Sequence, residues 1–367
     1  MDKEIIIFGA ALDASDFPLN IQMKQAYLHR LHNELIEEQD LLDPYDGMLF
    51  HSNILSNDKY IKSGKFFIDS WLTPKPTLED YSKINQVDFQ KATYDGTIKK
   101  YSNKLAEYVK ATIFPGIPLM IGVDHSLTGG VLSALSKKYG AQNILIVVLD
   151  AHFDGIPARI SLNIANYLKD HPDDFNSLVS EQLISTNDNF NIKDTYTCAS
   201  FLYYLLEENI ILPENLIILG NQDYPNQKIR TIEDPRIKKY VNYFNLMEEN
   251  GVTFIRKMES VEMQEKLKAK LDTVDNPYIY ISLDVDVGGL KDIIAARFRN
   301  AIGMAKSEIL NIVKILKKFI MLKKCELIGL DVMEIDIHLL GKSFPKSGRK
   351  DLTVEVVDEF LDVLLKH

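Results

Sequence analysis

Residues 144–154 read ILIVVLDAHFD, six apolar residues that end in a burst of acid and histidine. A short run that is apolar on both faces is typical of a parallel strand covered by two helix layers. In extended backbone alternate side chains share a face, so Asp150, His152 and Asp154 can converge where the strand runs into its loop. Because parallel sheets place active sites beyond the carboxyl ends of their strands, this stretch predicts both the fold and the location of a site.

Two further apolar runs end in the same way. Residues 118–126 read PLMIGVDHS, and residues 278–286 read YIYISLDVD. Mixed imidazole and carboxylate ligands suit manganese, iron or zinc, and this number of ligands suits two cations that share bridging carboxylates. The three motifs together offer two imidazoles and five carboxylates, from His125, His152, Asp124, Asp150, Asp154, Asp284 and Asp286.

Each motif taken alone has an ordinary explanation. An Asp-x-His-x-Asp sequence could be a surface loop, Asp-x-Asp could be a solvated turn, and Asp124 or Ser126 could cap a helix. The occurrence of all three after buried strands favours the metal site, because unpaired carboxylates gathered in one crevice would repel one another.

Short β-rich runs alternate with helical stretches along the chain. This alternation predicts an α/β fold, with a doubly wound, mostly parallel sheet flanked by helices on both faces. Strands are expected at residues 4–8, 118–122, 144–150, 216–220, 253–256, 278–284 and 326–334. Helices are expected at residues 21–38, 98–114, 128–138, 199–208, 260–271, 306–322 and 353–366.

We expect residues 1–367 to form a single domain with irregular excursions at about residues 40–76 and 155–194. Long excursions between strand ends are usually lids or plain insertions. The second excursion leaves directly from a motif, so we interpret it as a lid or substrate wall. The role of the first is left open.

Composition excludes several functional classes. The chain has 367 residues, 46% of them hydrophobic, and a net charge of -10. It contains no basic block, which argues against nucleic-acid binding. Its two cysteines give no disulfide framework, and it shows no signal peptide and no long apolar span, so we expect a cytoplasmic protein without membrane contact.

A fourth apolar run ends in acids. Residues 327–336 read LIGLDVMEID, a predicted buried strand whose end carries Glu334. This carboxylate could pair with a planar cationic group of a substrate. An ordinary acid at the end of a strand is an equally good explanation of this segment by itself.

The four motifs, in this order, resemble those of the arginase/agmatinase (ureohydrolase) family. GVDHS resembles the family's GGDHS, DAHFD matches DAHxD, SLDVD matches SxDxD, and residues 331–336 resemble its ExNP element. The resemblance covers the chain from about Pro118 to the C-terminus. It implies an arginase-like three-layer sandwich.

The resemblance also implies a dinuclear Mn²⁺ site, with two ions per chain. One Mn²⁺ would take His125, Asp150, Asp154 and Asp284. The other would take His152, Asp150, Asp284 and Asp286, so that Asp150 and Asp284 bridge the ions.

The implied activity is hydrolysis of a C–N bond, other than a peptide bond, in a linear amidine. A hydroxide between the ions would attack the guanidino carbon of an arginine-like substrate and release urea. Asp154 would orient the hydroxide and Glu334 would hold the guanidinium. Family members are commonly oligomeric, so a homo-oligomer is a further expectation from analogy.

The sequence departs from the family where substrate is recognised. Val123 replaces the second motif glycine, IAARFR at residues 294–299 replaces a glycine- and proline-rich loop, and Ile335-Asp336 replaces Asn-Pro. The loop that reads the carboxylate of a free amino acid is absent at residues 155–160, and residues 195–198 hold no histidine to shuttle protons. Arg159 and Asp223 are the candidate substrate contacts besides Glu334.

These departures leave alternatives open. The substrate could be an arginine-containing peptide, giving peptidyl-ornithine, or a compound with a formimino or amide-like C–N bond. The protein could also be a non-catalytic, metal-binding regulatory member of the fold. A deacetylase-like architecture with a single zinc is a third class, which two metals per chain would exclude.

Overall fold

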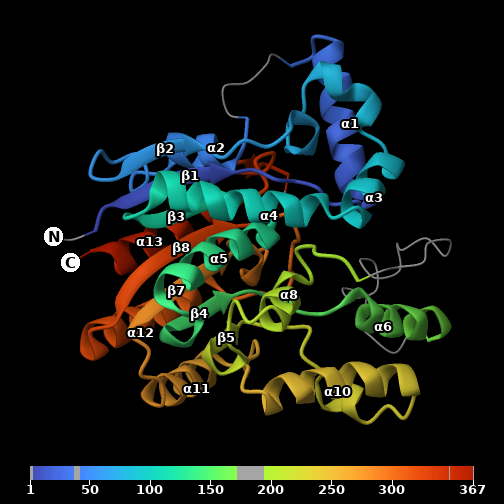
Figure 1. The fold of residues 1–367 in the computed structure, drawn as a ribbon. Coiled ribbons are helices and arrows are strands. Elements are labelled where there is room, and N and C mark those ends of the chain that lie inside the picture. Colours follow the sequence, from blue (N-terminus) through green and yellow to red (C-terminus); the bar gives the residue numbers. More distant parts are fainter. Residues whose placement is uncertain (1–2, 37–41, 172–193, 347, 367) are drawn as a thin grey trace.

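A computed structural model of the chain describes residues 3–36, 42–171, 194–346 and 348–366. Its centre is a sheet of eight strands in the order β2-β1-β3-β8-β7-β4-β5-β6, and every pair of neighbours runs parallel (Figure 1). The predicted parallel sheet is therefore confirmed. The strands are β1 (Ile5–Ala10), β2 (Ile61–Lys65), β3 (Ile117–Gly122), β4 (Ile144–Leu149), β5 (Leu216–Leu219), β6 (Thr253–Ile255), β7 (Tyr278–Asp284) and β8 (Glu326–Met333).

Strand β4 shows why these runs are apolar on both faces. Its residues Ile144, Ile146 and Val148 belong to the hydrophobic cluster on one side of the sheet. The alternate residues Leu145, Val147 and Leu149 belong to the cluster on the other side. Burying each such side chain stabilises the fold by about 1.5–3 kcal/mol, which accounts for the unbroken apolar run before Asp150.

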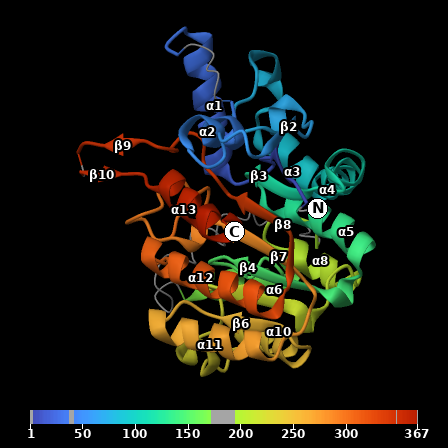
Figure 2. The same cartoon turned by 90° about the vertical axis from the view of Figure 1, so that its left-hand side faces the viewer.

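Helices cover both faces of the sheet. One layer contains α1 (Pro18–His32), α3 (Gln86–Tyr94), α4 (Thr97–Tyr108), α5 (Thr128–Tyr139), α6 (Ala158–Asp170), α8 (Phe201–Glu207) and α10 (Pro235–Glu249). The other contains α2 (Pro44–His51), α11 (Ser260–Asp272), α12 (Lys306–Lys323) and α13 (Thr353–Leu365). Figure 2 shows α11, α12 and α13 side by side in front of the sheet, with α4 and α5 on its far side.

The expected helices exist with shifted ends. The stripe Ile309, Ile312, Val313 and Leu316 of α12 is fully buried against the sheet, as its helical spacing predicts. Helix α1 begins at Pro18 and ends at His32, earlier than expected. Helix α4 ends at Tyr108, where a π-helical turn at residues 109–113 continues the chain.

The expectation that residues 40–76 are irregular was wrong. Asp43 caps α2 by accepting a hydrogen bond from the Asp46 amide (3.1 Å), with Pro44 at the first helical position. Strand β2 forms the edge of the sheet beside β1. It was missed because its sequence, IKSGK, is half-exposed and lacks an apolar run.

The second excursion also begins with regular structure. Helix α6 occupies residues that were expected to be irregular. The remainder, residues 172–193, lies outside the described residues, and the interpretation as a lid stays a prediction. Helices α3, α9 (Gln227–Arg230) and α10 were not expected either. None of the helices in the described part of the chain is long and apolar enough to cross a membrane.

Candidate metal centre

Four neighbouring strands bring the motifs together. The central order β3-β8-β7-β4 places residues 123–126, Glu334, Asp284 and Asp150 at one edge of the sheet. The His125 amide and the Glu334 side chain, 209 residues apart in sequence, are joined by a hydrogen bond of 3.2 Å. The predicted meeting of the motifs at the carboxyl ends of the strands is thus observed.

A shared turn orients the first carboxylate of each motif. Asp124 accepts a hydrogen bond from the Ser126 amide (3.0 Å), and Asp150 accepts one from the His152 amide (2.6 Å). Asp284 accepts one from the Asp286 amide (2.8 Å). An Asp that bonds the backbone two residues on folds its own chain into a turn. These turns therefore fix the direction of the first carboxylate, and the residue two positions on contributes its backbone amide.

The first ligand cluster surrounds the imidazole of His125. Its Nδ1 atom lies 3.0 Å from Asp154 Oδ2 and 3.1 Å from both Asp150 Oδ2 and Asp284 Oδ2. All four side chains are buried, and their ligand atoms lie within 4.8 Å of one another. One ring proton can serve only one of three acceptors, whereas a cation satisfies all four groups at once.

The second cluster shares Asp150 with the first. His152 Nδ1 lies 2.9 Å from Asp286 Oδ2 and 3.6 Å from Asp150 Oδ1. These three groups also offer ligand atoms within 4.8 Å of one another. Asp284 belongs to the first cluster by this distance, so its role as a second bridge stays a prediction.

The electrostatics of the two clusters call for positive charge. Burial raises the pKa of Asp284 well above its ordinary value, and burial with the nearby charge of Asp150 raises the pKa of Asp154 to about 7. Burial alone would lower the pKa of His125, but its hydrogen bonds to the three carboxylates raise it well above the ordinary value. Asp286 Oδ2 is buried, and its contact with His152 Nδ1 lacks the geometry of a hydrogen bond. Divalent cations in place of these protons fit the donor set.

A buried network fixes the ring of His125. Its Nε2 atom lies 2.8 Å from Ser282 Oγ, and that hydroxyl donates to Asp331 Oδ1 (2.6 Å). Asp331 Oδ2 accepts from Thr128 Oγ1 (2.6 Å) and from the Tyr280 hydroxyl. The ring therefore carries a proton on Nε2 and directs Nδ1 at the carboxylates. Sequence reasoning gave Ser282 and Asp331 no role, although a charged residue inside an apolar strand was a signal.

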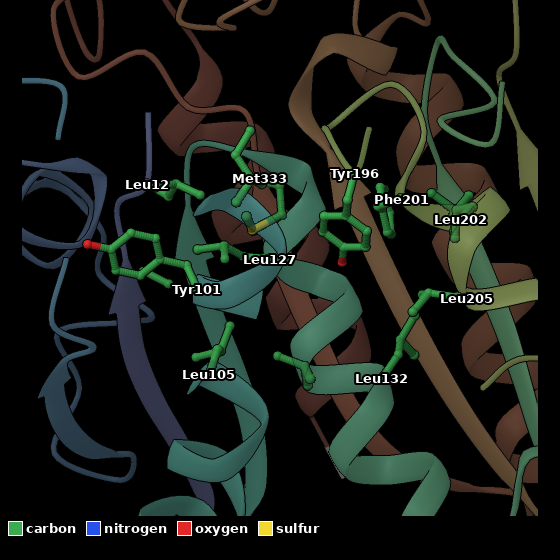
Figure 3. Close-up of a cluster of buried hydrophobic side chains, with 14 of the residues drawn as sticks. Leu12, Tyr101, Leu105, Leu127, Leu132, Tyr196, Phe201, Leu202, Leu205 and Met333 are labelled. Carbon is green, nitrogen blue, oxygen red and sulfur yellow. The ribbon is translucent and has the colours of Figure 1, made fainter. Parts of the chain in front are cut away.

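A cluster of buried hydrophobic side chains packs against the site. The Phe201 ring packs 5.0 Å from the ring of His125. Leu12, Leu127 and Met333 belong to the same cluster, and Figure 3 shows Leu127 and Met333 close together. Because Leu127 follows His125 by two residues and Met333 precedes Glu334, core packing holds both motifs.

Glu334 lies at the rim of the first cluster in an unusual conformation. Its φ is 60°, in the left-handed region that non-glycine residues rarely occupy, and its amide donates to the Val123 carbonyl (2.9 Å). Oε1 accepts the bond from the His125 amide, and Oε2 is buried without a hydrogen bond. An unpaired carboxylate oxygen beside the clusters is suited to a cationic ligand group.

The profile of the Arginase family matches residues 69–342, which is 274 of the 367 residues. The chain belongs to the arginase family. Members of this family are metal-dependent hydrolases that act on C–N bonds of linear amidines. The resemblance seen in the four motifs is therefore confirmed.

Individual relatives are distant. Among curated proteins, an arginase of Staphylococcus aureus (strain MRSA252) is 28% identical over 218 residues, which are 56% of this chain and 59% of that protein. The chain thus matches less than two thirds of the length of this relative. Among solved structures, arginase from Bacillus cereus has a TM-score of 0.53 at 16% identity, covering 100% of this chain and 99% of that one. Formimidoylglutamase from Bacillus subtilis has a TM-score of 0.52 at 16% identity, covering 100% and 87%. These likenesses show the arginase fold.

Of the other predicted substrate contacts of this arginase-family chain, Asp223 adjoins the second motif and Arg159 pairs with another residue. Asp223 is partly buried, accepts a hydrogen bond from the Phe153 amide (3.1 Å), and has a pKa that burial raises to about 6. The Arg159 side chain is 54% exposed, pairs with Asp194 and lies over the ring of Tyr203. Because its guanidinium is engaged, its contact with substrate stays a prediction.

The segment at residues 195–198 packs against the first motif. Tyr196 is buried, and its hydroxyl donates to the Ser126 carbonyl (2.7 Å). His171, at the end of helix α6, is exposed and stacks on Tyr167 at 4.3 Å.

Proposed function

We propose that this arginase-family protein is a metal-dependent hydrolase that releases urea from a guanidino compound. The observation that carries the proposal is the unpaired, buried Oε2 atom of Glu334 beside two clusters of carboxylate and imidazole groups. A guanidinium is planar, cationic and rich in N–H donors, so it matches a carboxylate in this position.

We propose that the two clusters hold two Mn²⁺ ions. The first would take His125, Asp150, Asp154 and Asp284. The second would take His152, Asp286 and the shared Asp150. The resemblance to the family adds Asp284 to this second set. When bound, the ions supply the positive charge that makes water a competent nucleophile near neutral pH.

The remaining steps fall to the side chains of the chain itself. Glu334 binds the guanidinium through Oε2 and turns its central carbon toward the clusters. Asp154 orients the attacking water, since its carboxylate borders His125 and lies at the open side of the buried set. Positioning of this kind supplies much of the barrier reduction in such reactions.

Peptidyl arginine is the second candidate substrate. Arg159, the cation that follows the second motif, already forms an ion pair with Asp194, so a free amino acid would have to compete with Asp194 for it. A substrate whose carboxylate is already in a peptide bond does not need that contact. A formimino substrate becomes the better explanation if Glu334 proves dispensable.

The test is urea release by Mn²⁺-loaded protein from arginine, agmatine, 4-guanidinobutyrate and arginine-containing peptides. We expect urea from at least one of them, and its loss in Glu334→Gln and Asp154→Ala. Asp358→Asn is the matched control, because this carboxylate bonds the Asn53 amide (3.0 Å) from helix α13, outside the metal clusters. Bound metal without urea from any substrate would instead favour a regulatory role.

A further inference from the structure

A buried group of charges lies beside the strand end that carries Glu334. Arg297 Nη2 donates to both oxygens of Asp13, at 2.6 and 2.8 Å. The side chains of Arg297 and Asp13 are only 5% and 2% exposed. Lys24 Nζ lies 3.4 Å from Asp13 Oδ2 and is equally buried. No catalytic step uses these residues, although buried ion pairs are costly to form.

Lys24 and the backbone immobilise Asp13. Lys24 Nζ donates to the carbonyls of Asp13 (2.7 Å) and Thr73 (2.8 Å), and the Asp13 amide donates to the Leu72 carbonyl (2.7 Å). Asp13, which lies in the segment that follows strand β1, is thereby tied to residues 72–73 and to helix α1. A fixed carboxylate that receives a planar guanidinium defines the position of the arginine closely.

Arg297 in turn holds the backbone of Glu334. Its amide donates to the Glu334 carbonyl (2.7 Å), and the Asp336 amide donates to the Ala295 carbonyl (2.9 Å). Ala296 and Ile335 form an antiparallel bridge between these two bonds. Residues 295–297 therefore pair with residues 334–336, the segment that begins at Glu334.

The backbone of Glu334 requires such support. A positive φ at a residue with a large side chain costs about 1–3 kcal/mol and persists only when the surroundings determine it. The carbonyl of Glu334 is fixed by Arg297 and its amide by Val123, and the resulting conformation aims the carboxylate at the His125 amide. Loss of either bond would let the residue relax to a more common conformation.

We propose that Arg297 is a positioning residue that holds the carboxylate of Glu334 in place for the guanidinium. Its side chain is anchored by Asp13, and its amide fixes the carbonyl of Glu334. The segment that follows β1 therefore holds, through Arg297, the residue that follows β8. This inference rests on the proposed role of Glu334 in binding guanidinium.

The test measures binding of methylguanidinium to Mn²⁺-loaded protein by calorimetry, with metal content measured in parallel. Arg297→Met removes the anchor and keeps an unbranched chain, whereas Arg297→Lys keeps the charge and loses the planar fork. Arg236→Lys is the matched control, because Arg236 donates to Asp234 (2.8 Å) and binds Asp170 in helix α6. Glu334→Gln is measured beside them.

We expect Arg297→Met to weaken methylguanidinium binding by about tenfold or more at unchanged metal content, with a smaller loss in Arg297→Lys, since displacement of a binding group by about 1 Å can cost up to about a hundredfold. Arg236→Lys should bind as wild type. If Arg297→Met does not fold, Arg297→Lys decides, and wild-type binding by the variant that folds overturns the inference. If Glu334→Gln weakens binding and the Arg297 variants do not, only the positioning role fails. If Glu334→Gln binds as wild type, the proposed role of Glu334 fails and the inference falls with it.

Discussion

Replacing Ser282 with alanine tests whether the network behind His125 serves the metal site. The Ser282 hydroxyl lies 2.8 Å from His125 Nε2 and donates to Asp331 Oδ1 at 2.6 Å. The variant removes both contacts and frees the ring to rotate or to move its proton to Nδ1. Loss of such a supporting contact typically lowers metal affinity by about 10- to 100-fold, or about 1.4 to 2.7 kcal/mol.

The same change should also lower stability. It leaves the Nε2 proton and one Asp331 oxygen without partners in a buried region, at a cost of about 1–3 kcal/mol for each group. Metal affinity and folding are therefore measured separately, by titration of the metal-free protein with Mn²⁺ followed by electron paramagnetic resonance, and by denaturant unfolding. Ser133→Ala is the control, because Ser133 Oγ donates only to the Gly129 carbonyl in α5 (2.6 Å).

We expect Ser282→Ala to lose both stability and Mn²⁺ affinity, and Ser133→Ala to leave the affinity unchanged. Mn²⁺ affinity within twofold of wild type in a destabilised Ser282→Ala protein would refute the reasoning. The network would then serve packing of the sheet, and the ring of His125 would be held by other contacts.

Three further predictions concern the substrate carboxylate, the metal clusters and the buried lysine. Glu334→Gln should lower kcat/KM for urea release by about 10²- to 10³-fold with metal content unchanged, because a neutral amide loses the charge-assisted bonds to a guanidinium; steady-state kinetics with metal analysis measures both. Mn²⁺ at a hundred times its Kd should stabilise the protein by about 2.7 kcal/mol per independent site and so raise its Tm, and a chelator should reverse this rise. Equal Tm values with and without Mn²⁺ would contradict metal binding. Burial lowers the pKa of Lys24 from 10.5 to about 8, so its contribution to stability is complete above pH 10.5 and is lost as the pH falls through 8. Between pH 8 and 10.5 the free energy of unfolding of the wild type, measured with denaturant, should therefore rise by about 3 kcal/mol relative to that of Lys24→Met. Parallel pH dependences of the two proteins would contradict a lowered pKa at Lys24.

Much of the sheet was predictable because its central strands obey one strong rule. A strand such as β4 must be apolar on both faces, and that pattern is rare elsewhere in the chain. Edge strand β2 escapes the rule, since one side faces no further strand and its residues are half-exposed. Helix α10 was missed despite clear signals, an Asp234 cap and Pro235 at its start, because its apolar stripe is built of tyrosines as much as aliphatic residues.

The candidate site, like the sheet, was predictable only in part. Its ligand clusters were predictable because two of the motifs carry two or three ligands within five residues, and each motif folds its own turn. The support around them was not, because it is built from single residues that lie far apart. Arg297 and Asp13 are separated by 284 positions, and no local pattern marks either residue as a partner of Glu334.

The strand order has a consequence for how the protein matures. Strands β3 and β4, which carry the first two motifs, are not neighbours, because β8 and β7 lie between them. A chain emerging from the ribosome thus displays both histidines long before the late strands can insert and set the spacing of the early ones. Metal ions can therefore bind only after almost the entire polypeptide has been synthesised. A prematurely terminated chain would carry metal ligands without a complete binding site.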